Sequence, residues 1–273
     1  MKKLNLSRAV IQACLIFWAA LQIFPLYWLL TFSLKDNTEI FQGNMVGLPS
    51  VWRFENYTHA FMGGNVGRYL ANSIIVTAAT ILIVCIASLM ASYALIRMKW
   101  KLQKTFQLIF IMGITIPIHA ALLPVFIMMR QVHLINTYWC LIIPYSAFAV
   151  PMAIMISSGF ISSIPVELEE AACIDGCNIY KIFIQIILPL MKPSLATIAI
   201  FTFLQSWNEL MFAVVFISKP AYRTLTVGIQ SLVGQYTTDW GPIGAGLVVA
   251  IIIIYVILSR QVQQSLIAGS VKG

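Results

Sequence analysis

The chain is organised around the segment Glu169-Glu170-Ala171-Ala172-Cys173-Ile174-Asp175-Gly176, which lies between two long apolar runs. Together with the preceding Glu167, this segment holds four of the nine acidic residues in the whole sequence. Charged residues are scarce elsewhere in the chain. A cluster of this kind is therefore expected outside any apolar environment, where it faces water or a partner.

The composition surrounding this segment is that of a membrane protein. The 273 residues are 60% hydrophobic and only 10% charged, whereas a soluble domain carries about 25% charged residues. The net charge of +8 could indicate a nucleic-acid-binding protein. In a membrane protein with several spans, however, excess Lys and Arg is typical of cytoplasmic loops, and we favour that interpretation.

Six apolar runs are long enough to supply the roughly 20 residues that a helix needs to cross a bilayer. We expect them to be spans at about residues 9–34, 69–96, 106–129, 138–160, 193–218 and 240–259. The first run is longer than the apolar region of a signal peptide, so we expect it to be retained. The sequence predicts an all-α integral membrane fold that forms one domain over residues 1–273.

The distribution of Lys and Arg predicts the orientation of these spans. If both termini are cytoplasmic, eleven basic residues lie on the cytoplasmic side: Lys2, Lys3, Arg8, Arg97, Lys99, Lys101, Lys104, Lys181, Lys192, Arg260 and Lys272. Six lie outside: Lys35, Arg53, Arg68, Arg130, Lys219 and Arg223. The positive-inside rule favours this arrangement. It places the acidic segment, within residues 161–192, in the cytoplasm.

The acidic segment carries helix start and stop signals. Pro165 suits the first turn of a helix, and the glutamates that follow it favour the positive end of the helix dipole. Gly176 is suited to end the helix in a left-handed conformation. We expect helices over residues 165–175 and 178–187, which together form a stiff cytoplasmic elbow. The alternative is a solvated acidic connector.

The motifs of the chain resemble those of a known family. Glu170-Ala171-Ala172-x-x-Asp175-Gly176, followed by Ile187-Leu188-Pro189-Leu190, resembles the EAA loop of ABC-importer permeases. Phe54-Glu55-Asn56-Tyr57, Trp207-Asn208-Glu209 and the ending Ala268-Gly269-Ser270-Val271-Lys272-Gly273 are similar to the carbohydrate, maltose-type branch. The resemblance covers nearly the whole chain. Ser270 departs from the Ala that is usual in that ending.

The resemblance implies a type I ABC-importer permease with six transmembrane helices and a cytoplasmic coupling helix. Its coupling contact to an ATPase subunit would fall on Glu170, Ala171, Ala172, Asp175 and Gly176. It implies four partners in a bacterial cell membrane: a homologous second permease, two ABC ATPases and an extracytoplasmic substrate-binding protein. The substrate class would be a sugar, in the first instance an oligosaccharide, with polyols or sugar phosphates as alternatives.

The chain itself is not expected to be an enzyme. A phosphate-binding loop needs a Gly-Lys pair before Ser or Thr, and the sequence contains no such pair. ATP, with Mg²⁺, would therefore bind at the partner ATPases, and no cofactor or metal is expected on this chain. The sequence also lacks a catalytic constellation of the kind that a membrane-embedded enzyme would need.

Glu209 is the one acidic residue within an expected span, and such residues are functional candidates. With Trp207 and Asn208, it could line a translocation pathway, where an aromatic ring stacks on a sugar and polar groups bond its hydroxyls. Alternatively, Asn208 and Glu209 hold helices together. A rival function is an ion-gradient-driven secondary transporter or channel, which would be expected to carry several acids or histidines within its spans.

Overall fold

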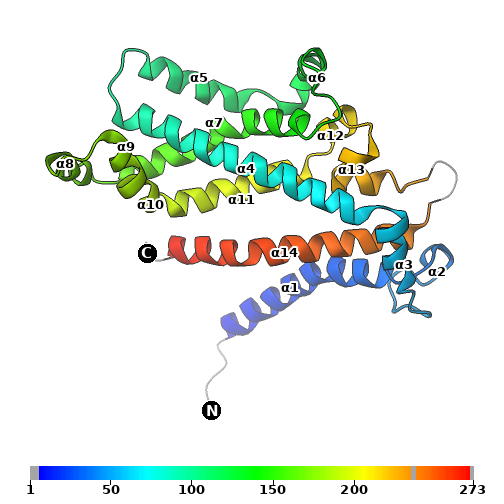
Figure 1. Cartoon of the computed structure of the whole chain (residues 1–273). Helices are drawn as coiled ribbons and strands as arrows, with labels where there is room; N and C mark the ends of the chain where they lie inside the picture. The colour runs from blue at the N-terminus through cyan, green and yellow to red at the C-terminus, as the bar shows by residue number, and fades with distance from the viewer. Residues whose placement is uncertain (1–5, 235–237, 271–273) are drawn as a thin grey trace. The chain divides into compact units, whose positions relative to one another are not determined.

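The computed structural model describes residues 6–234 and 238–270, with side chains from residue 10 to residue 256 outside that gap. These residues form helices and turns and no strand, as the sequence predicts (Figure 1). The elements in order are α1 (Leu6–Phe32), α2 (Asn37–Phe41), α3 (Glu55–Thr58), η1 (His59–Gly63), α4 (Val66–Arg97), α5 (Gln103–Thr115), η2 (Ile118–Ala121), α6 (Leu122–Gln131), α7 (Trp139–Ser163), α8 (Glu167–Ile174), α9 (Ile179–Ile182), η3 (Phe183–Ile187), α10 (Leu188–Leu190), α11 (Lys192–Asn208), α12 (Met211–Phe216), η4 (Pro220–Tyr222), α13 (Leu225–Gln230) and α14 (Trp240–Ser270).

The chain divides into two compact units, and each combines segments that are distant in sequence. The first unit holds Met1–Gly67 and Gly228–Ile254, and the second holds Arg68–Val227 and Tyr255–Gly273. The acidic elbow and the Trp-Asn-Glu motif both belong to the second unit.

Within the described part of the chain, three helices are long and apolar enough to cross a membrane: Val10–Phe32, Val66–Arg97 and Trp139–Ser163. They coincide with the spans expected at 9–34, 69–96 and 138–160. Up to five spans result if two bent helix pairs are each counted as one span. The sixth expected span, 240–259, falls on α14, whose described apolar part is Trp240–Val256. Its end, residues 257–259, lies beyond the described side chains.

The third and fifth expected spans are not continuous helices. In the third, α5 and the following Ile118–Gln131 segment meet at an angle of 95°. Ile116 is extended there (ψ 116°) because the ring of Pro117 disfavours the helical conformation in the preceding residue. In the fifth, α11 stops at Asn208, since Glu209 is also extended (ψ 123°), and a separate helix, α12, follows.

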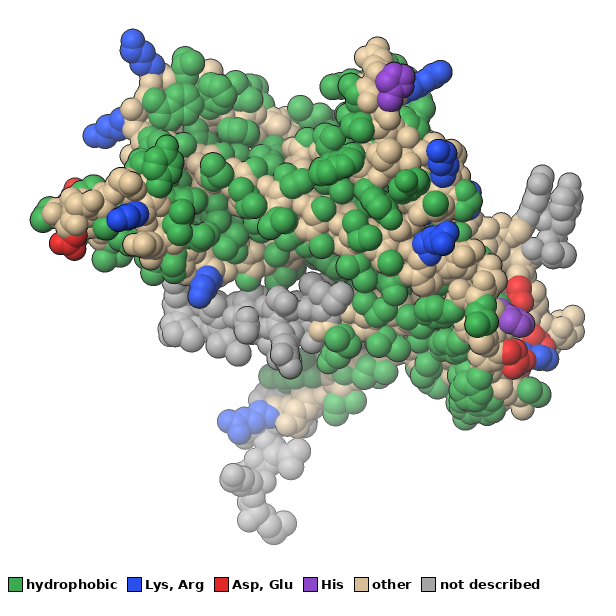
Figure 2. Space-filling model, in the orientation of Figure 1, with side chains coloured by type: hydrophobic (Ala, Val, Ile, Leu, Met, Phe, Trp, Pro, Cys, Tyr) green, Lys and Arg blue, Asp and Glu red, His purple; other side chains and the backbone are tan. Residues whose placement is uncertain are grey.

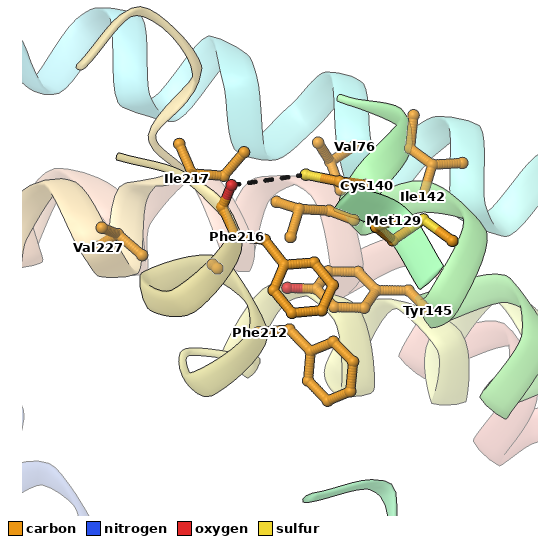
Figure 3. Close-up of a cluster of buried hydrophobic side chains, with 11 residues drawn as sticks. Val76, Met129, Cys140, Ile142, Tyr145, Phe212, Phe216, Ile217 and Val227 are labelled. Carbon is orange, nitrogen blue, oxygen red and sulfur yellow. Dashed lines mark hydrogen bonds between the residues drawn. The ribbon is translucent and has the colours of Figure 1, made fainter. Parts of the chain in front are cut away.

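The second unit is built around α7, which packs against α5 and against α11 (Figure 1). Ala149 and Ala153 of α7 meet Val84 of α4 and Ile198 of α11 in a buried cluster. A larger apolar cluster joins α7 to α12, where the rings of Tyr145, Phe212 and Phe216 lie close together (Figure 3). Small and aromatic residues of α7 thus bring three long helices and the short α12 together.

The first unit holds a buried lysine just after α1. Lys35 is fully buried, and its Nζ donates hydrogen bonds to the carbonyl oxygens of Asn44 (2.6 Å) and Gly47 (2.7 Å). Burial lowers the pKa of this ammonium group below its usual value. Asn56, from the Phe-Glu-Asn-Tyr motif, donates to the carbonyl oxygens of Ser33 and Lys35, each at 2.9 Å. This asparagine therefore braces the segment after α1.

Gly241, at the start of α14, fits tightly against this brace. A Cβ atom at this position would lie 2.5 Å from the carbonyl oxygen of Lys35 and would also collide with the amide of Asn56. We expect Gly241→Ala to lower the free energy of unfolding by about 1–3 kcal/mol, measured as a lower Tm of the detergent-solubilised protein. Gly159→Ala is the control, because nothing lies within 4 Å of its Cβ position. An equal Tm for the two variants would contradict the prediction.

Candidate functional site

The predicted elbow is present and consists of α8 followed by α9 and η3. The first helix begins at Glu167, two residues later than predicted. Ile164, before Pro165, is extended (ψ 127°) and ends the preceding helix α7. Three glutamates occupy its first turn, as expected. The second helix, α9, is capped by Asn178, whose side chain accepts a hydrogen bond from the backbone N–H of Lys181 at 2.9 Å. The helical segment then continues as a π-helix to Ile187.

The turn between the two helices is closed by Gly176, as the sequence predicts. Its φ of +77° lies in the left-handed region, which glycine adopts without steric cost. The N–H of Gly176 donates to the carbonyl of Cys173 (3.0 Å), and the N–H of Cys177 donates to that of Ala172 (2.9 Å). These two bonds form a Schellman motif, which satisfies the last carbonyl groups of α8. The elbow is therefore a defined turn and not a loose connector.

The two faces of α8 have different surroundings. Glu170, Ala171, Asp175 and Gly176 are exposed, and the exposed fraction of the adjacent Ile174 is 87%. Acidic side chains are visible over α8 in Figure 2. Ala172, however, is buried in a cluster with Leu89, Tyr93, Ile161, Ile182, Ile187 and Met191. The small side chain of Ala172 thus packs against the chain's own core. The other four predicted residues, Glu170, Ala171, Asp175 and Gly176, remain exposed and available to a partner.

Glu209 occupies the break between α11 and α12 and is buried, with 8% exposed. Its carboxylate accepts hydrogen bonds from the backbone N–H of Phe212 (3.0 and 3.1 Å) and from the hydroxyl of Tyr145 (2.8 Å). The Nε2 atom of His119 lies 3.6 Å away, from the η2 turn. The side chain therefore caps α12 and joins it to α7.

The other two residues of the Trp-Asn-Glu motif point in different directions. Trp207 is buried and its ring stacks on Phe203, with centroids 5.1 Å apart. Asn208 is exposed, and its amide donates to the carbonyl of Leu204 at 2.8 Å. The motif thus places two side chains inside the helix packing and one on the surface.

Sequence reasoning did not identify the side chains that hold these groups in place. Tyr145 supports Glu209, whereas Tyr93 and Arg97 contact Glu169 of α8. The one available signal was that Arg97 is the first charge after an uncharged span. Among the residues that the structure describes, no group of three or more potential metal ligands is present.

The fold and the polar elbow define a multi-pass integral membrane protein. Residues 83–272 match the family described as "Binding-protein-dependent transport system inner membrane component". The probable ABC transporter permease protein YurM of Bacillus subtilis is 36% identical over 92% of this chain and 84% of its own length. The chain therefore belongs to the inner membrane components of binding-protein-dependent transport systems, which are permeases of ABC transporters.

Other relatives match along most of their length. The diacetylchitobiose uptake system permease protein NgcG of Streptomyces coelicolor is 32% identical over 96% of this chain and 88% of its own. The probable starch degradation products transport system permease protein AmyC of Thermoanaerobacterium thermosulfurigenes is 32% identical over the full length of both chains. A chain of a bacterial ABC transporter that imports the acidic polysaccharide alginate has the same fold. Its TM-score is 0.83, with 22% identity over 97% of this chain and 98% of that one.

The cap formed by Glu209 makes a testable prediction. Glu209→Ala leaves the buried N–H of Phe212 and the hydroxyl of Tyr145 without their acceptor, which we expect to lower the free energy of unfolding by about 2 kcal/mol or more. Thermal unfolding in detergent measures this loss. Glu209→Gln keeps one acceptor oxygen and should lose less, while Asn208→Ala on the exposed surface should stay within about 0.5 kcal/mol of wild type. Equal losses for Glu209→Ala and Asn208→Ala would rule out the cap.

Proposed function

We propose that this permease translocates a sugar, in the first instance an oligosaccharide, which a substrate-binding protein delivers to it. The substrate class is supported by the relatives, which are named for uptake of diacetylchitobiose and transport of starch degradation products. Polyols and sugar phosphates are the alternative substrates. The chain supplies the path, and separate ATPase subunits bind ATP with Mg²⁺ and hydrolyse it.

The observation that carries the coupling proposal is the geometry of α8. It is a short helix closed by a left-handed Gly176, and it presents Glu170, Ala171, Asp175 and Gly176 on its exposed face. A helix held in one orientation and exposed on one face can transmit a displacement as a rigid body. We propose that this face contacts an ATPase subunit, so that closure of the ATPases moves the elbow.

The proposed assembly contains this chain, a homologous second permease, two ABC ATPases and an extracytoplasmic binding protein. We propose that residues 1–273 form one permease domain in the bacterial cell membrane, with six spans and both termini in the cytoplasm. The excess of Lys and Arg on the proposed cytoplasmic side supports this orientation. In this proposal α1, α4, α7 and α14 are four of the spans, the bent pair Gln103–Thr115 and Ile118–Gln131 is the third span, and α11 with α12 would make up the fifth, 193–218.

The geometry around the break after α11 separates the roles of the three candidate pathway residues. Trp207 and Glu209 are buried and are engaged by Phe203, Phe212 and Tyr145. We infer that Glu209 holds helices together, that Trp207 packs within its own helix, and that the exposed Asn208 is the one placed to meet a sugar. The same bonding of Glu209 argues against the rival ion-gradient transporter, because its carboxylate already accepts several hydrogen bonds.

Uptake by the reconstituted complex tests the proposed function. Vesicles that contain this chain, its second permease and its ATPases should accumulate radiolabelled oligosaccharide when binding protein is outside and ATP is inside. Protonophores should leave the rate unchanged. Mass spectrometry of the sugar that co-purifies with the binding protein selects the oligosaccharide to be tested. Uptake that proceeds without ATP and is abolished by a protonophore would favour the ion-gradient alternative.

The contact proposed for Gly176 yields a sharper prediction. Gly176→Asp adds bulk and charge on the exposed face, where nothing lies within 4 Å of the Cβ position, and it also strains the left-handed turn, whose φ is +77°. We expect normal amounts of the variant in the membrane but at least a tenfold loss of uptake, because the added side chain blocks the partner surface and the strained turn no longer holds α8 in place. Quantitative immunoblotting measures insertion, and vesicle uptake measures coupling. Wild-type uptake would refute the docking role of this residue.

A further inference from the structure

A largely enclosed ion pair joins α8 to the end of α4. The Nε atom of Arg97 lies 2.7 Å from the Oε1 atom of Glu169, and each side chain is only 12% exposed. Arg97 is the last residue of α4, and more than 70 positions separate the two residues in the sequence. The two residues belong to different helices that do not follow one another in the chain, so the contact is a tertiary one made by their side chains.

The same guanidinium also holds the end of α7. Its second terminal nitrogen donates hydrogen bonds to the carbonyl oxygens of Ile161 (3.0 Å) and Ile164 (2.5 Å). The last carbonyls of a helix lack partners within that helix, and a cation is favoured at this negative end of the helix dipole. Arg97 therefore links three elements, since it ends α4, caps α7 and pairs with α8.

Tyr93 completes the arrangement from one turn earlier on α4. Its hydroxyl donates to the Oε2 atom of Glu169 at 2.9 Å. The Oε1 atom has no hydrogen bond and contacts Nε of Arg97 as an ion pair. The ring of Tyr93 packs against Phe183 of η3, with centroids 5.1 Å apart. The cluster that buries Ala172 lies alongside. The neighbouring Glu167 and Glu170 are exposed, so one of the three glutamates of α8 is directed inward.

We propose that Arg97, Glu169 and Tyr93 form a clamp that makes the coupling helix move as one body with the ends of α4 and α7. A helix of eight residues is too short to be stable alone, and the chain tethers it only at its two ends. The clamp adds a third attachment, to a span that α8 does not follow in sequence. These are positioning residues: they transmit the displacement that the exposed face of α8 receives. The inference rests on the proposed coupling function.

The first experiment tests the clamp without requiring transport. Hydrogen exchange of the α8 amides is followed in the full-length permease in lipid nanodiscs. Glu169→Gln removes the charge and keeps the volume, and we expect α8 to exchange about tenfold faster. Glu167→Gln is the matched control on the same turn of the helix and should exchange like wild type. Equal exchange in the two variants would overturn the clamp.

The second experiment tests transmission in the assembled importer in vesicles. Tyr93→Phe removes one hydroxyl and keeps the ring packing, so it serves if Glu169→Gln fails to fold. With ATPase subunits still co-purifying, we expect either clamp variant to raise the ATP hydrolysed per sugar imported several-fold, whereas Glu167→Gln leaves this ratio unchanged. If the ATP hydrolysed per sugar stayed unchanged in the clamp variants, the proposal that the clamp transmits motion would be wrong. The same would hold if the variants only lowered the amount of assembled complex. A wild-type complex that imports no sugar would instead refute the proposed function.

Discussion

Wherever a helix ends or breaks, it leaves backbone N–H and C=O groups without partners inside the helix, and charged side chains of this chain supply such partners at two of these places. Glu209 supplies the acceptor for α12 after α11 stops. Arg97 supplies the donors for the last carbonyls of α7. In a chain with only 10% charged residues, these charged side chains act first as partners for the backbone. Their positions in turn determine where helices can end and turn.

The features that the sequence predicts correctly are those encoded locally. Uninterrupted apolar runs locate α1, α4 and α7, because length and hydropathy are properties of a single segment. Gly176 predicts the end of α8 because the left-handed turn is a requirement of one residue. The start at Asn178 follows the same logic, since a capping side chain acts only three residues ahead.

The features that the sequence does not reveal depend on contacts between distant segments. The partner of Glu209 is Tyr145, which lies 64 positions earlier, and the partner of Glu169 is Arg97. No spacing rule relates such pairs, because the folded arrangement of α4, α7 and α11 creates them. The break of the fifth expected span is similar. Residues 193–218 form one apolar run in the sequence, whereas in the structure Glu209 is extended and its carboxylate bonds Phe212 of α12 and Tyr145 of α7.

The two faces of α8 show why an acidic motif can serve both anchoring and contact. Ala172 and Glu169 point toward the chain's own core, where a small side chain permits close packing and a paired carboxylate fixes orientation. Glu170 and Asp175 remain on the exposed face. In the proposed coupling mechanism, a helix anchored on one side cannot rotate to absorb a push from the other, so displacement at the exposed face would reach α4 and α7. The residues proposed to transmit motion are thus different from those proposed to receive it, although they are interleaved within one short helix.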